Sequence, residues 1–381
     1  MNRRDFLQFA SLTMAGSMIP GMDLLAEARY SGKIVVLVHL DGGNDGFNTL
    51  VPYADEAYYA LRPKIAIKGR HVIKLKDGFG MHPQLKPLEQ YWKSGQMAWV
   101  QGLGYPNAIL SHFKSLDVWE SGSVNQHAQG WLANVLPKYK KGLHGVVIGG
   151  AVGGNSVMKG SQLNAVTMQN PKSFIKAAGR ISDIGISRRN PAIAHVSNVQ
   201  HQLHQVGKQI AERVGPSPKG VPGRFRGELG HGLEAVAQMI LSGVDAPVYK
   251  VRQDGFDTHA GQITAQSNSL FQLANGLHSF ANVMRRSGRW NDVVVVTYSE
   301  FGRRAKENRG QGTDHGTASA HLVMGGAVKQ GIYGKHPDLK RLDGNGNVAH
   351  TTDFRSLYAT LSERWWRQGN PWKGHRSIPF V

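Results

Sequence analysis

The sequence is defined first by what it lacks. None of its 381 residues is cysteine, which excludes thiolate metal sites, cysteine nucleophiles and disulfide bridges. After the first 30 residues it has no apolar run near the roughly 18 residues that a membrane span needs. We therefore expect no transmembrane segment in the mature protein. A content of 40% hydrophobic and 19% charged residues predicts a globular chain with a large core.

Acidic residues are also scarce, with 26 Asp and Glu against 45 Lys and Arg, a formal net charge of +19. Such a field attracts polyanions, including anionic lipid, acidic or sulfated polysaccharide and phosphorylated substrates. The chain has no recognisable nucleic-acid module, so we expect no nucleic acid partner. The alternative is a generally basic surface with no dedicated ligand.

The N-terminal segment has the features of an export signal. Adjacent Arg3 and Arg4 precede a moderately apolar stretch at 9–19, and an A-x-A sequence ends at Ala28. This order is typical of a twin-arginine signal peptide over 1–28, the alternative being an amphipathic helix. The sequence thus predicts a periplasmic or secreted protein whose partner is the twin-arginine export machinery. That route carries proteins that fold before export, which favours a bound ion.

The remaining chain, 29–381, is predicted to form a single α/β domain. Short apolar runs that end in glycine or polar residues alternate with helical periodicity, which indicates a mainly parallel sheet with helices on both faces. The segment 172–226, rich in Lys, Arg, Gln and Gly, is interpreted as a peripheral insertion. The glycines of 149–155 lack dinucleotide-binding spacing and predict a structural turn. The expected strands lie near 33–40, 98, 146, 248 and 295, and the expected helices at 84–94, 111–121, 191–214, 227–242, 262–287 and 353–366.

Ligands of parallel sheets bind beyond the carboxyl ends of the strands, and there this chain carries carboxylates and histidines. Each has a structural alternative: Asp257 could cap the following helix, Glu300 could pair with the arginines after it, and "GTDHGT" could be a polar turn. Taken together, they favour a divalent metal site of zinc, manganese, iron or calcium. The predicted ligands are Asp41, Asp257, His259, Glu300, Asp314 and His315. Asp314 has the second interpretation of orienting His315.

A nucleophile candidate opens the helix predicted at 111–121. Ser111 lies in the first turn, where backbone N–H groups favour an anion, although serine is also a preferred helix cap. His112 beside it could orient a substrate, act as a base, or pack under the helix. Arg303 is a candidate clamp for an oxyanion. His39, within the first strand, is interpreted as a packing or surface residue.

Several motifs carry a family resemblance. In this order, "LDGGNDGFNTLVP", "YPNAILSHFKSLDVWESG", "GFDTH", "TYSEFGRR" and "GTDHGTAS" resemble the exported bacterial family known as domain of unknown function 1501. That family is similar to the alkaline phosphatase and sulfatase superfamily. The resemblance implies an alkaline-phosphatase-like three-layer sandwich with Ser111 at the nucleophile position. It implies metal ligands at Asp41, Asp257, His259, Glu300 and His315.

The chain departs from that superfamily in one important place. The superfamily commonly ends its late strand in S-D-H-G, whereas this chain has Phe301 at the histidine position, so a second metal would lose an imidazole ligand. The absence of cysteine also excludes formylglycine made from cysteine. We expect a metal-dependent hydrolase of phosphate or sulfate esters on an anionic small molecule or polysaccharide. The alternatives are a noncatalytic protein that binds an envelope or matrix polyanion and an envelope assembly factor.

Overall fold

The computed structural model describes residues 14–15, 32–125, 128–139, 142–149, 156–160, 162–180, 191–215 and 221–381. The predicted signal peptide lies outside this description except for β1 (Met14–Ala15), which pairs with β8 (Ala165–Met168). The glycine-rich turn predicted at 149–155 also lies outside it apart from Gly149. No helix in the described ranges is both long enough and apolar enough to cross a membrane.

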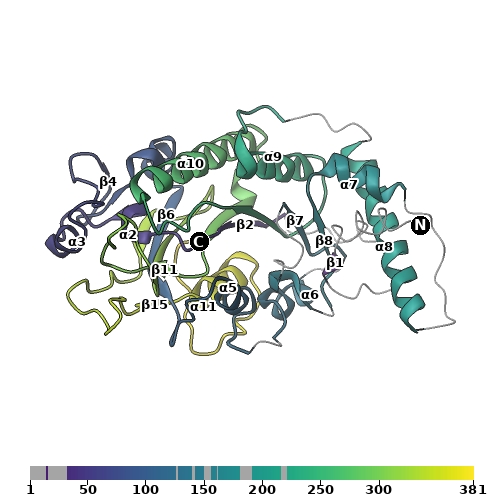
Figure 1. Ribbon diagram of the computed structural model, residues 1–381. Helices are drawn as coiled ribbons and strands as arrows, with labels where there is room; N and C mark the ends of the chain where they lie inside the picture. The colour runs from purple at the N-terminus through teal and green to yellow at the C-terminus, as the bar shows by residue number, and fades with distance from the viewer. Residues whose placement is uncertain are drawn as a thin grey trace.

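A central sheet of ten strands organises the molecule (Figure 1), with the order β1-β8-β7-β9-β2-β10-β13-β6-β14 and with β15 also paired to β6. The neighbours from β8 to β10 are parallel, and β13 runs antiparallel between β10 and β6. All five predicted strands are present: β2 (Ile34–Leu40), β6 (Met97–Gly104), β7 (Gly145–Ile148), β9 (Val248–Gln253) and β10 (Val293–Tyr298). The strands of this sheet that we did not predict are β1, β8, β13 (Ser319–Gly325), β14 (Gly331–Tyr333) and β15 (Thr352–Asp353).

Helices cover both faces of this sheet. Figure 1 shows α9 (Gly227–Leu241) and α10 (Gln262–Arg286) along one face, and α5 (His112–Ser121), α6 (Leu136–Tyr139) and α11 (Arg355–Thr360) along the other. Strand β2 shows why its apolar run is continuous. Val36 and Val38 pack on the α9 and α10 side, whereas Val35 and Leu37 pack on the α5 side, since successive side chains of a strand face opposite ways. The predicted three-layer α/β sandwich is confirmed.

Smaller elements complete the described fold. Beyond β8 lie α7 (Pro171–Ala178) and α8 (Pro191–Val214), which pack together within the segment 172–226. There are also two small sheets. In one, β5 (Gly80–Met81) lies between β3 (Leu50–Val51) and β4 (Ile73–Lys74), and in the other β11 (Gly302–Arg303) pairs with β12 (His315–Gly316). The short helices are α2 (Gly46–Thr49), α3 (Glu56–Leu61), α4 (Glu89–Lys93), η1 (Pro83–Leu88), η2 (Trp131–Asn134), η3 (Ser156–Met158), η4 (Trp290–Asp292) and the π-helical η5 (Leu361–Trp365).

Candidate metal centre

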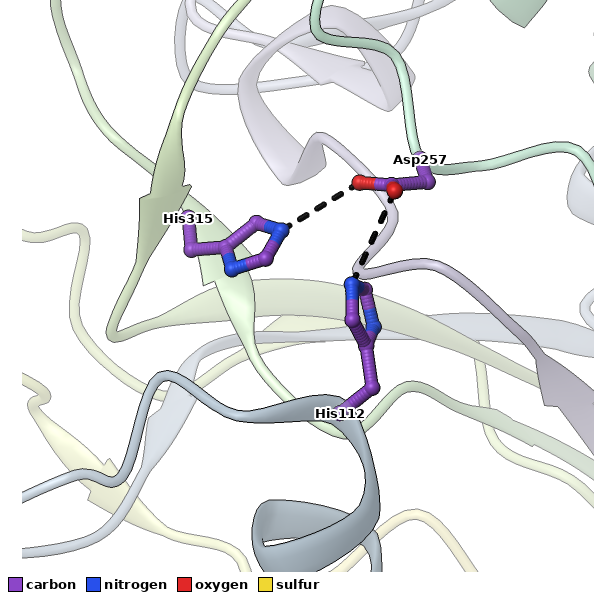
Figure 2. Close-up of side chains that lie close together, drawn as sticks. All are labelled: His112, Asp257 and His315. Atoms are coloured by element: carbon purple, nitrogen blue, oxygen red, sulfur yellow. Dashed lines mark hydrogen bonds and ion pairs between the residues drawn. The ribbon is translucent and has the colours of Figure 1, made fainter.

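The carboxyl ends of three adjacent parallel strands place the candidate residues at one edge of the sheet. Strand β2 lies between β9 and β10 and is parallel to both. The loops that follow these strands carry Asp41, Asp257 and Glu300. These loops begin side by side, although more than 200 positions separate Asp41 from the other two residues in the sequence. The start of α5 and the strand β12 bring His112 and His315 to the same edge (Figure 2).

Three side chains form the centre of the site. Figure 2 shows the carboxylate of Asp257 between two imidazoles, with Oδ1 3.2 Å from Nε2 of His315 and Oδ2 3.7 Å from Nε2 of His112. One ligand atom from each residue lies within 4.8 Å of the others. These three residues come from a helix start, a loop and a strand far apart in the sequence.

Two further predicted ligands border this centre. His259 places Nε2 3.1 Å from Oδ1 of Asp257 and 3.0 Å from Nε2 of His315. Asp314 lies behind His259, with Oδ1 3.6 Å from its Nδ1. A hydrogen bond from Asn308, together with the charge of Arg304, holds the pKa of Asp314 below its usual range against the opposing effect of burial. We name His112, Asp257, His259, Asp314 and His315 the exposed cluster.

Arg303 supports Asp257 from below. Burial alone would raise the pKa of Asp257, but the hydrogen bond and charge of Arg303 lower it below its usual value. The Arg303 side chain is fully buried and donates 2.5 Å to Oδ1 of Asp257. It also donates to the backbone carbonyls of Gly42, Gly43, Phe256 and Thr313. These contacts favour a positioning role over the predicted clamp on a substrate oxyanion.

Glu300 is buried behind His112. Its Oε1 lies 2.6 Å from Nδ1 of His112 and accepts from the amide of Gly42 at 2.9 Å, while its Oε2 lies 3.1 Å from Nε2 of His39. Burial raises the pKa of Glu300, but the hydrogen bonds from the two histidines outweigh it and hold the pKa far below its ordinary value. The alternative in which Glu300 pairs with the following arginines is wrong, because its carboxylate contacts histidines and an amide.

A glycine makes this arrangement fit. Gly42 has φ +115°, and a Cβ at this position would clash with the backbone nitrogen of Asp257. The absence of a side chain therefore lets the loop after β2 lie against the loop after β9. The amide of Gly42 can then donate to Oε1 of Glu300.

Asp41 turns away from the exposed cluster. Its Oδ2 accepts from Arg252, including a 2.6 Å bond from Nε. It forms a second group with His39 and Glu300, in which one ligand atom from each lies within 4.8 Å of the others. The structure thus divides the six predicted ligands between two groups. The exposed cluster contains Asp257, His259, Asp314 and His315, and the second group contains Glu300 and Asp41.

The capping alternative is wrong for Asp257 and holds for Ser111 in position only. Ser111 is the N-cap residue of α5 by position, but its hydroxyl makes no capping hydrogen bond. The N-cap of α10 is Gly261, not Asp257. Ser111 therefore lies, partly exposed, at the start of a ten-residue helix directly before His112.

Phe301 packs beneath the centre. It is 1% exposed, and its ring centroid lies 4.9 Å from that of His112 and 4.5 Å from that of His315. Phe301 thus restricts both imidazoles from below and contributes no ligand atom.

A buried network of polar side chains lies next to the exposed cluster. Asp45 forms a two-point ion pair with Arg62, at 2.5 and 3.1 Å, and accepts from Gln262. Gln262 also accepts from Thr313 at 2.6 Å, one residue before Asp314. We name this set, Asn44, Asp45, Asn48, Thr49, Arg62, Gln262, Gln266 and Thr313, the buried network.

Sequence reasoning missed three residues of the site. His39 was interpreted as packing, yet it binds Glu300; a single polar residue within the apolar run of β2 was the available signal. Asn308 donates to Asp314 and to the carbonyl of His259. Arg252 binds Asp41 across adjacent strands. Nothing in the sequence separates Asn308 and Arg252 from ordinary surface residues.

The donor set suits a metal that accepts nitrogen and oxygen. Neutral imidazole and carboxylate are ligands for zinc, manganese and iron, whereas calcium takes oxygen almost exclusively. Burial lowers the pKa of His315 and so favours its neutral, ligating form, with the hydrogen bond to the carbonyl of Leu110 opposing. The residues present therefore fit a divalent transition metal better than calcium.

Comparison with known proteins identifies the family. Residues 101–376 match the family described as Protein of unknown function (DUF1501), and the chain belongs to it. No curated protein sequence shows significant similarity to this chain.

Solved structures similar to the chain include alkaline phosphatase superfamily members. A protein in the Alkaline Phosphatase Superfamily from Vibrio parahaemolyticus is 8% identical, with a TM-score of 0.41 over 95% of this chain and 74% of that one. A lipoteichoic acid synthase from Listeria monocytogenes is 9% identical, with a TM-score of 0.40 over 99% and 80%. A sulfatase from Pseudoalteromonas sp. is 9% identical, with a TM-score of 0.41 over 91% and 70%. These similarities concern the fold, and none assigns a role to a residue of this chain.

Proposed function

We propose that this protein is a metal-dependent hydrolase of phosphate or sulfate esters. The observation that carries the proposal is the direction of the lone pairs at the exposed cluster. Nδ1 of His315 lies 3.1 Å from the carbonyl oxygen of Leu110, which can only accept, so Nδ1 carries the proton and Nε2 of the neutral ring carries a lone pair. That lone pair faces Oδ1 of Asp257 at 3.2 Å, and a cation between the two relieves their repulsion.

His112, Asp257 and His315 would hold the metal, and His259 is close enough to become a fourth ligand. Zinc, manganese or iron there would stabilise negative charge on an ester oxygen and on the attacking group. Arg303 keeps the Asp257 carboxylate ionised and oriented. Phe301 packs against the rings of His112 and His315 and restricts their movement.

Ser111 is proposed as the nucleophile. Its hydroxyl is not engaged in capping α5, and the N–H groups of the first helical turn favour a bound anion. The order of the motifs, which resembles that of the alkaline phosphatase and sulfatase superfamily, supports phosphate and sulfate esters as the substrate class. The net charge of +19 supports an anionic small molecule or polysaccharide that carries the ester.

The N-terminal motif supports export through the twin-arginine pathway to the periplasm or beyond the cell. Its consequence is that the metal is inserted before export, during folding in the cytoplasm. The same net charge supports the second candidate, a noncatalytic protein that binds an envelope or matrix polyanion. Binding of that kind weakens steeply with salt and does not depend on Ser111 or His315.

Elemental analysis of the folded, signal-free protein tests the proposal. We expect about one equivalent of zinc, manganese or iron in the wild type and a clear loss in His315→Ala, together with lost turnover of phosphate and sulfate esters. The control is His71→Ala, since His71 is exposed and lies outside the site. Metal-free protein in both forms after refolding with added ions would reject the hydrolase and leave the polyanion-binding protein.

A further inference from the structure

Glu300 has a different role from the metal ligand that the sequence resemblance implies. We infer that Glu300 is a positioning residue, which fixes the His112 imidazole so that its Nε2 lone pair points at Asp257. The orienting step stands on the geometry alone, and its effect on metal affinity rests on the proposed function.

The carboxylate of Glu300 is engaged within the protein. Oε1 receives the Nδ1–H of His112 and the amide of Gly42, and Oε2 receives Nε2–H of His39. The Ser299 hydroxyl lies 3.4 Å from Oε2 but donates to the carbonyl of Leu40. The three donors use most of the about four lone-pair positions that a carboxylate offers, and the residue is 0% exposed, so a metal bond to Glu300 would have to form inside a closed, already hydrogen-bonded site.

The same contacts fix the tautomer of His112. An ionised carboxylate can only accept, so the 2.6 Å contact at Nδ1 means that Nδ1 carries a proton, and this hydrogen bond also raises the pKa of His112. When the ring is neutral its lone pair lies on Nε2, the atom that faces Oδ2 of Asp257 at 3.7 Å. A carboxylate behind a metal-binding histidine both orients the ring and makes it a stronger ligand.

The helix that carries His112 is held by the same residue. One turn further along α5, the Ser115 hydroxyl lies 2.5 Å from the backbone carbonyl oxygen of Glu300 and 2.7 Å from the hydroxyl of Tyr105. Glu300 thus binds α5 twice, through its side chain and through its main chain. The second carboxylate oxygen of Glu300 is held by His39. The His39 side chain is 2% exposed and stacks on Tyr298 with ring centroids 5.0 Å apart.

Glu300→Gln tests the inference, because the amide keeps the shape and removes the charge. Glu120→Gln is the matched control: Glu120 is also buried in the α5 layer, and its carboxylate contacts Lys250 and Tyr298 instead of a histidine of the site. In the metal-free full chain we expect the Nδ1 proton of His112 to resonate far downfield in the wild type and in Glu120→Gln. In Glu300→Gln it moves upfield or exchanges too fast to observe. Titration with zinc alone should then show an affinity about 10- to 100-fold weaker for Glu300→Gln than for the control.

Zinc-soaked crystals of the wild type separate a positioning residue from a ligand. The anomalous peak is expected within bonding distance of His112, Asp257 and His315 and outside that of Glu300. A peak bonded to the Glu300 carboxylate, or a His112 proton signal unchanged in Glu300→Gln, would overturn the inference. Absence of zinc binding by the wild type would reject the proposed function, and the proton signal in metal-free protein would still decide the role of Glu300.

Discussion

The exposed cluster and the buried network lie at the same edge of the sheet but are built on opposite principles. In the buried network Asp45 is paired with Arg62, and the amides of Gln262 and Gln266 bind oxygens of the loop after β2. In the exposed cluster imidazole meets imidazole, with Nε2 of His259 3.0 Å from Nε2 of His315. The first arrangement is satisfied within the protein except at Nδ2 of Asn44, which has no hydrogen-bond partner among the described residues. The second brings together groups that a cation would hold better than they hold one another.

The comparison teaches that polar residues at the ends of parallel strands divide between two tasks. Residues that are paired with a hydrogen-bond or ion-pair partner fix the loops. Their substitution should therefore lower the free energy of unfolding. Residues whose neighbours carry the same kind of group, such as one imidazole beside another, are held in place by other side chains. Their substitution should therefore reduce function with little change in the free energy of unfolding. Arg62, within the buried network, and Ser111, directly before His112 of the exposed cluster, test these two effects.

Ser111→Ala should show the largest effect of these variants, and this effect should be on turnover and not on stability. Loss of a nucleophile typically removes at least about 10⁴-fold in kcat. The free energy of unfolding should change by less than about 0.5 kcal/mol, because the Ser111 hydroxyl makes no capping hydrogen bond. Steady-state hydrolysis of phosphate and sulfate esters and urea denaturation measure the two quantities.

Ser121→Ala is its control at the other end of α5, where the hydroxyl binds backbone carbonyls and the amide of Ser123 at the same helix end. Its turnover should match the wild type. A Ser111→Ala variant with normal turnover would remove Ser111 from the mechanism. A loss of unfolding free energy near 1 kcal/mol would restore the capping interpretation.

Arg62→Met should act on stability. Arg62 is 0% exposed and donates to Asp45, to Asn48 and to the carbonyls of Arg304 and Ala305. Its removal leaves the buried Asp45 charge unpaired, which costs about 3–5 kcal/mol. Urea denaturation at neutral pH measures the loss, and the exposed Arg341→Met, whose ion pair with Asp338 lies at the surface, should show none. An Arg62→Met variant as stable as the wild type would break the division between the two sets.

The strands and the order of the site residues could be predicted because they depend on local patterns. Apolar runs such as "IVVLVHL" indicate strands, and the polar residue after each run marks its carboxyl end. The antiparallel β13 was missed because the run at 319–325 begins with a polar Ser-Ala-His sequence and follows no helix. Its position between β10 and β6 depends on tertiary pairing, which the local pattern does not contain.

The division of the six predicted ligands could not be read from the sequence. Asp41 and Asp257 both follow a parallel strand and both pair with an arginine, Arg252 for Asp41 and Arg303 for Asp257. Asp257 in addition faces the imidazoles of His112 and His315. That difference depends on which helix starts and loops pack beside each carboxylate, and the local sequence does not contain this information. His39 illustrates the same limit, since its contact with Glu300 joins residues 261 positions apart.

His321 is the exception that sharpens the comparison, since it is buried like the network but has no hydrogen-bond partner on either ring nitrogen among the described residues. Burial lowers its pKa to about 3, with the charge of Glu300 opposing. The unfolded chain, with a pKa near 6.5, therefore binds a proton that the folded chain does not. Stability from this residue is complete above about pH 6.5 and is lost as the pH falls towards about 3.

His321→Leu should remove that acid sensitivity. Between pH 7 and pH 5 the wild type should lose about 2 kcal/mol more unfolding free energy than the variant, and at pH 7 the variant should be at least as stable because no unpaired polar group remains buried. Denaturation at both pH values measures this difference, with the exposed His71→Gln as control. Equal acid sensitivity in His321→Leu and the wild type would mean that His321 has a partner in solution, and His321 would then belong with the paired residues of the buried network.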